Sequence, residues 1–380
     1  MRVVSVSSSR ADVGILAPVW QALAAYDDAD LHLFLTGMHR AENAPPVEGI
    51  PEQATVHKGG ADLGGETGRR AAESMATITR SAGKLYAAVC PDAILVMGDR
   101  MDMLPAAVAS LPFNIPLVHL HGGEVTEGAV DDRIRHALSK LAHWHCVSSE
   151  GAKARLLAMG EIEDRITVTG APGLDTLLAA PELNKGDFLR RVGLPADADF
   201  RIVTVHPETN SSDVLAPLGA VLEALEQRVK PTIFTAPNSD PGGAEMHDRL
   251  DIFVAKNSWA VVQDTLGAAL YSNAMRHADL MLGNSSSGII EAGLFGLPVI
   301  NVGDRQKGRE RGENIIDVPN DAKAVIAALD RLGPTPARCI PGTPYGAGAA
   351  GPRVALAILS LPAPALLLAK PSPASAATGA

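Results

Sequence analysis

The sequence predicts an α/β protein made of two doubly wound domains that face each other across a cleft. With 380 residues, the chain is long enough for two such domains of ordinary size. Hydrophobic residues make up 46 % of it but aromatic residues only 4 %, a composition typical of aliphatic helices packed on parallel sheets. Short apolar runs alternate with helical stretches at intervals that suit βαβ units.

The apolar runs divide into two sets, and each set predicts one parallel sheet. The first set is Arg2 to Val6, Leu31 to Leu35, Ala93 to Met97, Pro116 to Leu120, Trp144 to Val147 and Ile166 to Val168. The second set is Arg201 to Val205, Thr232 to Thr235, Ala260 to Val262, Asp279 to Leu282 and Val299 to Val302. Residues 179–200, which contain prolines and mixed charges, predict a helix and the connection between the domains. Open parallel sheets bind ligands at the carboxyl ends of their strands, so segments that follow strands are the candidate site.

The net charge limits the partners that the protein can bind, and the cysteine content indicates its cellular compartment. A net charge of −10 disfavours a binder of nucleic acid or anionic membranes, because either surface requires a broad basic patch. The three cysteines, Cys90, Cys146 and Cys339, lie far apart without metal-ligand spacing, and the amino terminus lacks a signal-peptide pattern. We therefore expect a cytoplasmic protein.

The stretch from Gly283 to Ala292 predicts a phosphate-binding loop. It follows an apolar strand, and its glycines and the hydroxyls of Ser285, Ser286 and Ser287 open a short helix. Backbone N–H groups and the positive end of a helix dipole favour a phosphate there. Glu291, about one turn further, can accept a hydrogen bond from a sugar hydroxyl. The alternative is an ordinary capped helix.

Two motifs follow predicted strands of the first half. Ser7 to Asp12 precedes a helix expected to start near Val13, and Arg10 can hold a phosphate in a bidentate way. A surface pair between Arg10 and Asp12 is the alternative. In Gly98-Asp99-Arg100, Asp99 is a catalytic carboxylate or merely a helix cap.

The strand that ends in His119-Leu120-His121-Gly122-Gly123-Glu124 carries a third motif. Its glycines would let a substrate approach the backbone, and Glu124 would then protrude toward the ligand, unless it is simply solvated. The two histidines have no further ligand cluster, so the sequence predicts no metal site.

The helical stretch from Asp131 to Leu141 places an apolar stripe on one face. Asp131 lies on the side of that stripe and Asp132 nearly opposite, which makes Asp131 the inward candidate. Asp131 with Arg135 and Asp132 with His136 are also i,i+4 pairs, so a surface salt-bridge interpretation stays open.

Two further segments follow strands of the second half. His206, in Thr204-Val205-His206-Pro207-Glu208, is expected to face the cleft, and residues 301–311 form a basic loop or a solvated charged turn. Neither a Rossmann GxGxxG at the first helix nor a P-loop is present, and a nucleophile elbow is also lacking.

Taken together in their order along residues 1–350, these motifs resemble the hydrolysing UDP-N-acetylglucosamine 2-epimerases. The motifs that carry the resemblance are Ser9 to Asp12, Gly98 to Arg100, His119 to Ala129, Asp131 to His136, Gly170 to Asp175, Gly283 to Glu291 and Gly303 to Gly308. The resemblance implies two Rossmann-like domains of the glycosyltransferase-B type, a UDP-sugar as substrate, no cofactor and a homodimer.

In this family the reaction implied is anti elimination of UDP followed by hydration of a 2-acetamidoglucal. Carried over by motif position, Asp99, Glu124 and Asp131 form the acid/base set, and the sequence leaves open which of them takes the C2 proton. Arg10, His206 and the backbone from Ser285 to Gly288 would hold the diphosphate, and Glu291 the ribose. Arg135 and His136 would orient the carboxylates. Glu208 departs from the family pattern, which leaves its sugar contacts open.

The expected product is N-acetylmannosamine from UDP-N-acetylglucosamine, a step of sialic acid synthesis. The alternatives are the same reaction on UDP-2,4-diacetamido-2,4,6-trideoxyglucose, a glycosyltransferase of the same fold, and a nucleotide-sugar-binding regulator. The expected domains are residues 1–178, with the carboxylates, and 196–335, which binds UDP. Residues 345–361 would form a final helix packed on the first domain, and the Pro- and Ala-rich residues 362–380 a disordered tail without a membrane span.

Overall fold

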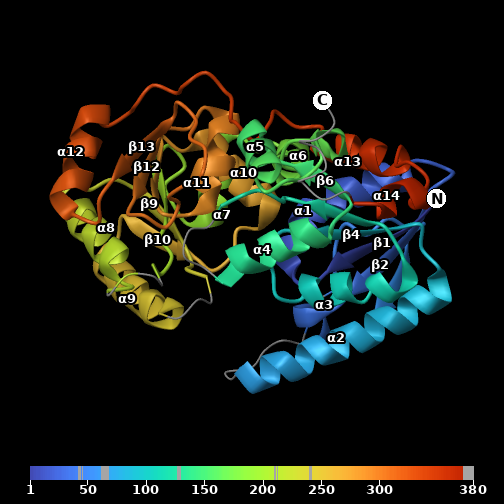
Figure 1. Ribbon diagram of the computed structural model, residues 1–380. Coiled ribbons are helices and arrows are strands. Elements are labelled where there is room, and N and C mark those ends of the chain that lie inside the picture. Colours follow the sequence, from blue (N-terminus) through green and yellow to red (C-terminus); the bar gives the residue numbers. More distant parts are fainter. Residues whose placement is uncertain are drawn as a thin grey trace. The chain divides into compact units, whose positions relative to one another are not determined.

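The computed structural model describes residues 1–41, 44, 46–60, 68–125, 130–208, 211, 213–238 and 242–370, with the side chains of Val130 and Asp131 excepted. It forms two compact units, each built around its own parallel sheet (Figure 1). Unit 1 comprises residues 1–124, 129–176 and 348–380, and unit 2 comprises residues 125–128 and 177–347.

Within the described part of unit 1, seven strands pair in the order β3-β2-β1-β4-β5-β6-β7. They are β1 (Arg2–Ser7), β2 (Asp30–Leu35), β3 (Thr55–Lys58), β4 (Ala93–Met97), β5 (Leu117–Leu120), β6 (Trp144–Val147) and β7 (Ile166–Val168). The helices are α1 (Arg10–Ala24), α2 (Gly68–Val89), α3 (Met103–Val108), α4 (Val130–Leu141), α5 (Glu150–Ala158), α13 (Ala350–Leu359) and α14 (Pro364–Leu368), with α6 (Gly173–Ala179) at the passage to unit 2. The 3-10 turns are η1 (Gly37–Arg40), η2 (Leu111–Phe113) and η3 (Glu163–Arg165).

Helices cover both faces of this sheet, because its strands carry apolar side chains on both sides. Residues of α2, α3 and α4 pack on one face, and residues of α1 and α13 pack on the other. Trp20 of α1 is fully buried in the second core, and its indole N–H donates to the Ser5 hydroxyl at 2.8 Å. Helix α13 lies against α1, so the chain returns to unit 1 after completing unit 2.

In the part of unit 2 that the structure describes, six strands pair in the order β10-β9-β8-β11-β12-β13. They are β8 (Arg201–Thr204), β9 (Thr232–Thr235), β10 (Ala260–Gln263), β11 (Leu280–Gly283), β12 (Val299–Val302) and β13 (Ile315–Val318). The helices are α7 (Lys185–Val192), α8 (Ala216–Gln227), α9 (Gly243–Lys256), α10 (Gly267–His277), α11 (Ser286–Ile290) and α12 (Ala322–Leu332), with a 3-10 turn η4 (Ala292–Phe295) after α11. One core lies between the sheet and α8, α9 and α12, and the other lies beneath α7 and α10.

The predicted α/β class with two parallel sheets is confirmed, and the strands differ from expectation mainly at the sheet edges. The sequence did not predict β3 and β13. Each pairs with a single neighbour, and their exposed or half-buried residues do not form a buried apolar run. Helix α1 starts at Arg10 rather than near Val13, because Ser9 caps it in a reciprocal capping box with Asp12.

The carboxyl-terminal segment is ordered further than expected. The prediction of disorder from residue 362 is wrong as far as residue 370, because Leu367 of α14 is buried and Arg165 donates to the carbonyls of Leu366, Leu367 and Ala369. Lys370 pairs with the buried carboxylate of Glu161. The remainder of the predicted tail, residues 371–380, lies outside the described residues.

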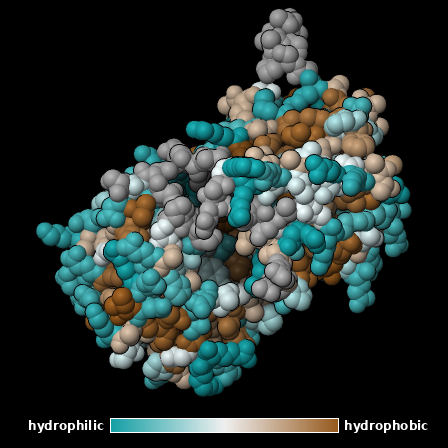
Figure 2. All heavy atoms as spheres, turned by 90° about the horizontal axis from the view of Figure 1, so that it is seen from below, coloured by the Kyte–Doolittle hydropathy of each residue, from teal (hydrophilic) through white to brown (hydrophobic). Residues whose placement is uncertain are grey.

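The face of the molecule seen in Figure 2 mixes hydrophilic and hydrophobic side chains over both units. Among the described residues, none of the helices combines the length and apolar character needed to cross a membrane.

Candidate active site

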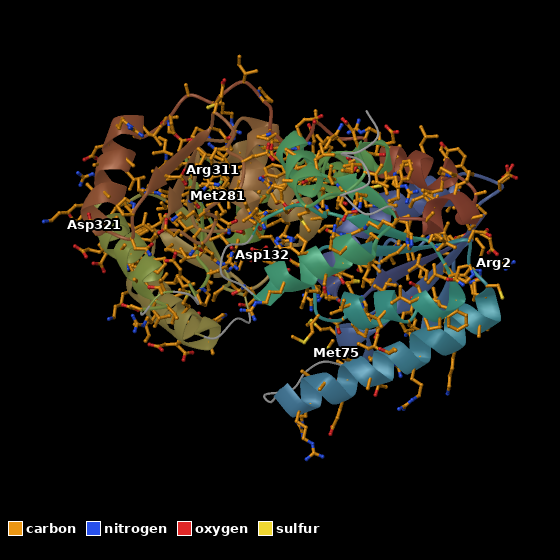
Figure 3. All side chains as sticks on the ribbon, viewed as in Figure 1. Arg2, Met75, Asp132, Met281, Arg311 and Asp321 are labelled. Atoms are coloured by element: carbon orange, nitrogen blue, oxygen red, sulfur yellow. The ribbon has the colours of Figure 1, made fainter. Side chains whose placement is uncertain are left out.

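In unit 1, Arg135 connects the loops that follow two neighbouring strands. Its side chain is only 3 % exposed, because α4 turns it inward. One guanidinium nitrogen donates to the Asp99 carboxylate, after β4, and the other donates to the backbone carbonyl of Glu124, after β5, at 2.9 Å. The second nitrogen also bonds Asp132 at the start of the same helix (Figure 3). One buried cation therefore fixes two of the carboxylate-bearing loops.

The Glu124 carboxylate does not protrude as the sequence suggested. Glu124 is 8 % exposed, and its Oε1 accepts hydrogen bonds from the Ser148 hydroxyl at 2.8 Å and from His121 Nδ1 at 2.6 Å. When Nδ1 carries the proton, Nε2 of His121 presents a lone pair. That Nε2 is buried, and it has no hydrogen-bond partner among the described residues.

The His121-Gly122-Gly123 turn explains why Glu124 is held inward. His121 has φ +62 and Gly123 has φ +73, both in the left-handed region that L residues rarely adopt. A Cβ on Gly123 would lie 2.3 Å from the carbonyl oxygen of Ala152, so the turn packs on α5 of its own unit. We expected these glycines to let a substrate approach the backbone. Gly123 instead allows the backbone of α5, at Ala152, to approach the turn closely.

His119 is a structural residue. It is fully buried, its Nδ1 bonds the Ser139 hydroxyl at 3.1 Å, and its Nε2 bonds the Gly98 carbonyl at 2.8 Å. Burial lowers the pKa of His119 to about 3, so the ring is neutral at physiological pH. It links α4 to the residue directly before Asp99. Among the described residues, no three metal-ligating side chains gather in one place.

Helix α4 carries two further residues that the sequence singled out. The side chain of Asp131 lies outside the described residues, so nothing places it relative to Asp99 and Glu124. His136 is exposed on α4. Asp132, which the helical pattern placed away from the core, is instead half-buried and pairs with Arg135 three positions later.

The loop after β1 is organised by Asp12 and not by Arg10. Asp12 is 1 % exposed, and its carboxylate accepts hydrogen bonds from the Ser8 and Ser9 backbone and hydroxyls. The surface pair with Arg10 is therefore wrong, and Arg10 itself is exposed at the start of α1. Arg100, part of the Gly98-Asp99-Arg100 motif but without a predicted role of its own, donates to the Ser8 hydroxyl at 3.0 Å.

Asp102, which the sequence did not mark as a site residue, is a buried carboxyl beside this loop. It is 2 % exposed, and its Oδ1 has no hydrogen-bond partner among the described residues. Burial raises the pKa of Asp102 to about 6, although Arg100, 3.8 Å away, opposes the increase. Asp102 directly precedes α3, so the local sequence suggests a helix cap and gives no signal that the carboxyl is buried.

In unit 2, Asn284 joins the ends of β8 and β11. Asn284 is fully buried, and its side-chain amide bonds both the backbone N–H and the backbone carbonyl of His206. The side chain of Gln306 donates to the backbone carbonyl of Asn284 at 2.9 Å. Gly283 has φ +138, and a Cβ there would lie 1.9 Å from the carbonyl oxygen of Thr204. The loop before α11 is therefore fixed by its contacts with β8. His206 Nδ1 accepts the N–H of Asn238 at 3.1 Å.

The predicted serine loop is present, and it opens a short helix as expected. Helix α11 has five residues, so its dipole contributes less to anion binding than that of a long helix. Ser285 caps it, and the Ser287 hydroxyl bonds the Tyr271 hydroxyl and lies 3.0 Å from Ser285 Oγ. Ser286 is half-buried at the first helical position. Gly288 is buried, and a Cβ there would lie 3.1 Å from a methyl carbon of Val299, which indicates a packing role.

Glu291 ends α11 as its carboxyl-terminal cap rather than lying within it. It is partly buried, and burial raises the pKa of Glu291 to about 7. In the described part of the chain no group donates a hydrogen bond to its carboxylate. This acid is thus available for a ligand hydroxyl.

Glu208, the residue at which the sequence departs from the family pattern, is held by hydrogen bonds within the protein. It is 8 % exposed and accepts from the backbone N–H of Asp304 at 2.9 Å and from the Asn320 amide at 2.5 Å. It therefore connects the loop after β8 to the loops after β12 and β13.

Comparison with known proteins places this arrangement in a family. The family model described as UDP-N-acetylglucosamine 2-epimerase matches residues 21–359. A relative from Legionella pneumophila, named UDP-N,N'-diacetylbacillosamine 2-epimerase (hydrolyzing), is 35 % identical over 86 % of this chain and 88 % of its own. A relative from Campylobacter jejuni, named GDP/UDP-N,N'-diacetylbacillosamine 2-epimerase (hydrolyzing), is 42 % identical over 60 % of each chain.

The fold agrees with a solved structure. The crystal structure of a UDP-GlcNAc 2-epimerase from Methanocaldococcus jannaschii, in complex with UDP-GlcNAc and UDP, superposes with a TM-score of 0.74, at 19 % identity, over 95 % of this chain and 99 % of the other. At that identity the likeness concerns the fold, which is of the glycosyltransferase-B type. The match over residues 21–359 shows that the chain belongs to the UDP-N-acetylglucosamine 2-epimerase family.

Proposed function

We propose that this protein is a hydrolysing 2-epimerase that acts on a UDP-linked 2,4-diacetamido-2,4,6-trideoxyhexose. The observation that carries the activity is the buried Arg135, which holds the loops of Asp99 and Glu124 in a member of this family. The relatives from Legionella and Campylobacter, named for diacetylbacillosamine, favour this sugar. UDP-N-acetylglucosamine, which the family description names, is the second candidate substrate.

The reaction begins with the loss of the C2 proton to a base while the C1–O bond to UDP breaks. The C2–H electron pair forms the C1–C2 double bond, and UDP leaves with the electrons of the broken bond. Water then adds its hydroxyl to C1, and C2 takes a proton from the opposite face. The sum is UDP-sugar plus water to UDP plus the free 2-epimer. A weakly acidic C2–H requires a well-placed base, and charge builds on the leaving diphosphate.

His121 is the base that this geometry favours. Its Nδ1 bonds the Glu124 carboxylate, which fixes the ring orientation and stabilises the imidazolium that forms when Nε2 takes a proton. The buried Nε2 has no competing partner among the described residues. Glu124 then acts as the orienting group in place of the proton acceptor expected from the sequence. Asp99 and Asp131 remain the candidates that return a proton to C2.

As the family resemblance implies, we assign the binding of the leaving group to the serine loop, His206 and Arg10. The backbone from Ser285 to Gly288, together with His206, would hold the diphosphate, and Glu291 would accept a hydrogen bond from a ribose hydroxyl. The ordered loop around Asn284 supports this assignment, because a binding loop that is fixed in advance loses less entropy when the ligand binds. Arg135 and His136 keep the roles of orienting residues, with Arg135 the one in contact with a carboxylate.

The test is an incubation of the protein with each UDP-sugar in deuterated water, followed by NMR. We expect free UDP and a free mannose-configured sugar with deuterium at C2, and a larger kcat/KM for the diacetamido substrate. A larger kcat/KM for UDP-N-acetylglucosamine would reverse the choice of sugar. Release of UDP only when an acceptor sugar is present would indicate a glycosyltransferase, and binding without turnover would indicate a regulatory protein.

A further inference from the structure

A cavity of about 590 Å³ opens in unit 2 at the end of the sheet opposite the serine loop. Arg201 is the first residue of β8 and Leu280 the first of β11, and both line it. The candidate UDP loops follow the other ends of the same strands. This cavity is therefore separate from the proposed active site, and its volume is that of a pocket for a small metabolite.

Among the described residues, one cation at the cavity has no carboxylate of its own within ion-pair distance. Three neighbouring cations have carboxylate partners: Lys185 pairs with Asp199, Arg228 with Asp330, and Lys230 with Asp279. Arg201 has no ion pair among the described residues. Its Nη2 donates to the carbonyl of Arg228, and its buried Nε has no hydrogen-bond partner in the described part of the chain.

Arg201 is only 4 % exposed, so this charge is desolvated. Burial lowers the pKa of Arg201 to about 10, although the negative charge of Asp279, which already pairs with Lys230, opposes the decrease. The guanidinium is therefore still charged at neutral pH. An unpaired buried charge destabilises a fold, and an anion that pairs with it removes that penalty. Planar carboxylates match the two-pronged donor edge of a guanidinium.

The remaining walls limit the kind of anion. Val229, Leu280 and Leu329 give the cavity an apolar side, whereas Asp330 and Asp199 place negative charge along it. A dianionic phosphate would be repelled by these carboxylates, but a singly charged group needs only the one unmatched cation.

We propose that this cavity binds a small monocarboxylate with an apolar body, held by Arg201. The carboxylate pairs with the guanidinium, and the apolar body contacts Leu280 and Leu329. This assignment does not depend on the proposed epimerase activity, because binding can be measured without turnover.

The experiment measures binding of cyclohexanecarboxylate by calorimetry and by the rise in melting temperature, with neutral cyclohexanecarboxamide as the matched ligand. We expect saturable binding of the carboxylate and at least about tenfold weaker binding of the amide. Arg201→Met should lose the binding and keep or raise the melting temperature, because it removes a buried unpaired charge. Arg331→Met, at an exposed residue of α12 outside the cavity, should bind as the wild type does.

A second variant tests the location without touching Arg201. Val229 lines the cavity and is 60 % exposed, so Val229→Trp should block it without disturbing the core. The proposal is overturned if a series from acetate to cyclohexanecarboxylate gives no saturable binding. Equal binding of acid and amide, or wild-type binding by Arg201→Met and Val229→Trp, also overturns it.

Discussion

The guanidinium of Arg135 donates a hydrogen bond to the carboxylate of Asp99, 36 positions earlier in the chain. The same guanidinium holds the backbone carbonyl of Glu124. The buried side chain of Arg135 therefore fixes the loops that follow β4 and β5, and with them the positions of the proposed acid/base groups.

Arg135→Lys should lower kcat by about 100-fold with a smaller change in KM, because an ammonium cannot bond both loops as a planar guanidinium does. The rate of UDP release measures this effect. Arg133→Lys, an exposed neighbour on α4, is the control and should retain the wild-type rate. Equal losses in both variants would remove Arg135 from its positioning role.

His121→Gln should lower kcat by about 100-fold or more, because the side chain can no longer accept the C2 proton. The isotope effect of a C2-deuterated substrate should grow, since proton removal becomes more rate-limiting. Added imidazole should partly restore turnover in His121→Ala, which a purely structural defect would not allow. His247→Gln, at a half-buried position of α9 in unit 2, serves as the control. Unchanged kcat and isotope effect in His121→Gln would assign the base to a carboxylate.

Asp102→Asn should stabilise the protein above pH 6 relative to the wild type. The pKa of Asp102 is raised by burial from 3.8 to about 6, so the folded state binds the proton more tightly than the unfolded chain. This group therefore stabilises the fold fully below pH 4 and loses that contribution as the pH rises to 6. Chemical denaturation at pH 4 and pH 8 measures the effect, expected at about 1–3 kcal/mol at the higher pH. A difference between variant and wild type that does not change with pH would contradict it.

Glu291→Gln should weaken UDP binding about tenfold at pH 8 and much less at pH 6. Burial raises the pKa of Glu291 to about 7, so only above that pH is its carboxylate the stronger, ionised acceptor for a ribose hydroxyl. Calorimetry measures the Kd of UDP for the wild type and the variant at each pH. The ratio of the two Kd values is independent of the ionisation of UDP, because the ligand is the same in both measurements. Parallel pH profiles for the two proteins would place the ribose elsewhere.

Much of the fold could be predicted from local sequence. The buried strand β4 is a continuous apolar run, and the buried strands β1 and β12 are mostly apolar, so the sequence identifies all three directly. The edge strands β3 and β13 were missed because hydrogen bonding to a neighbour, rather than apolar character, defines them. The order of α14 depends on Arg165 and Lys370, whose partners are distant in sequence.

For the candidate site, the sequence alone determined which segments follow strands and which carry carboxylates, hydroxyls and glycines, because these are local properties of the chain. It identified Asp99, Glu124 and the serine loop. Only the tertiary structure decided the direction in which each group points. The tertiary structure directs Glu124 toward His121 and Ser148. It also leaves three buried atoms, His121 Nε2, Asp102 Oδ1 and Arg201 Nε, without a hydrogen-bond partner among the described residues. Burial and pairing arise from contacts between residues far apart in the chain, and no local pattern encodes them.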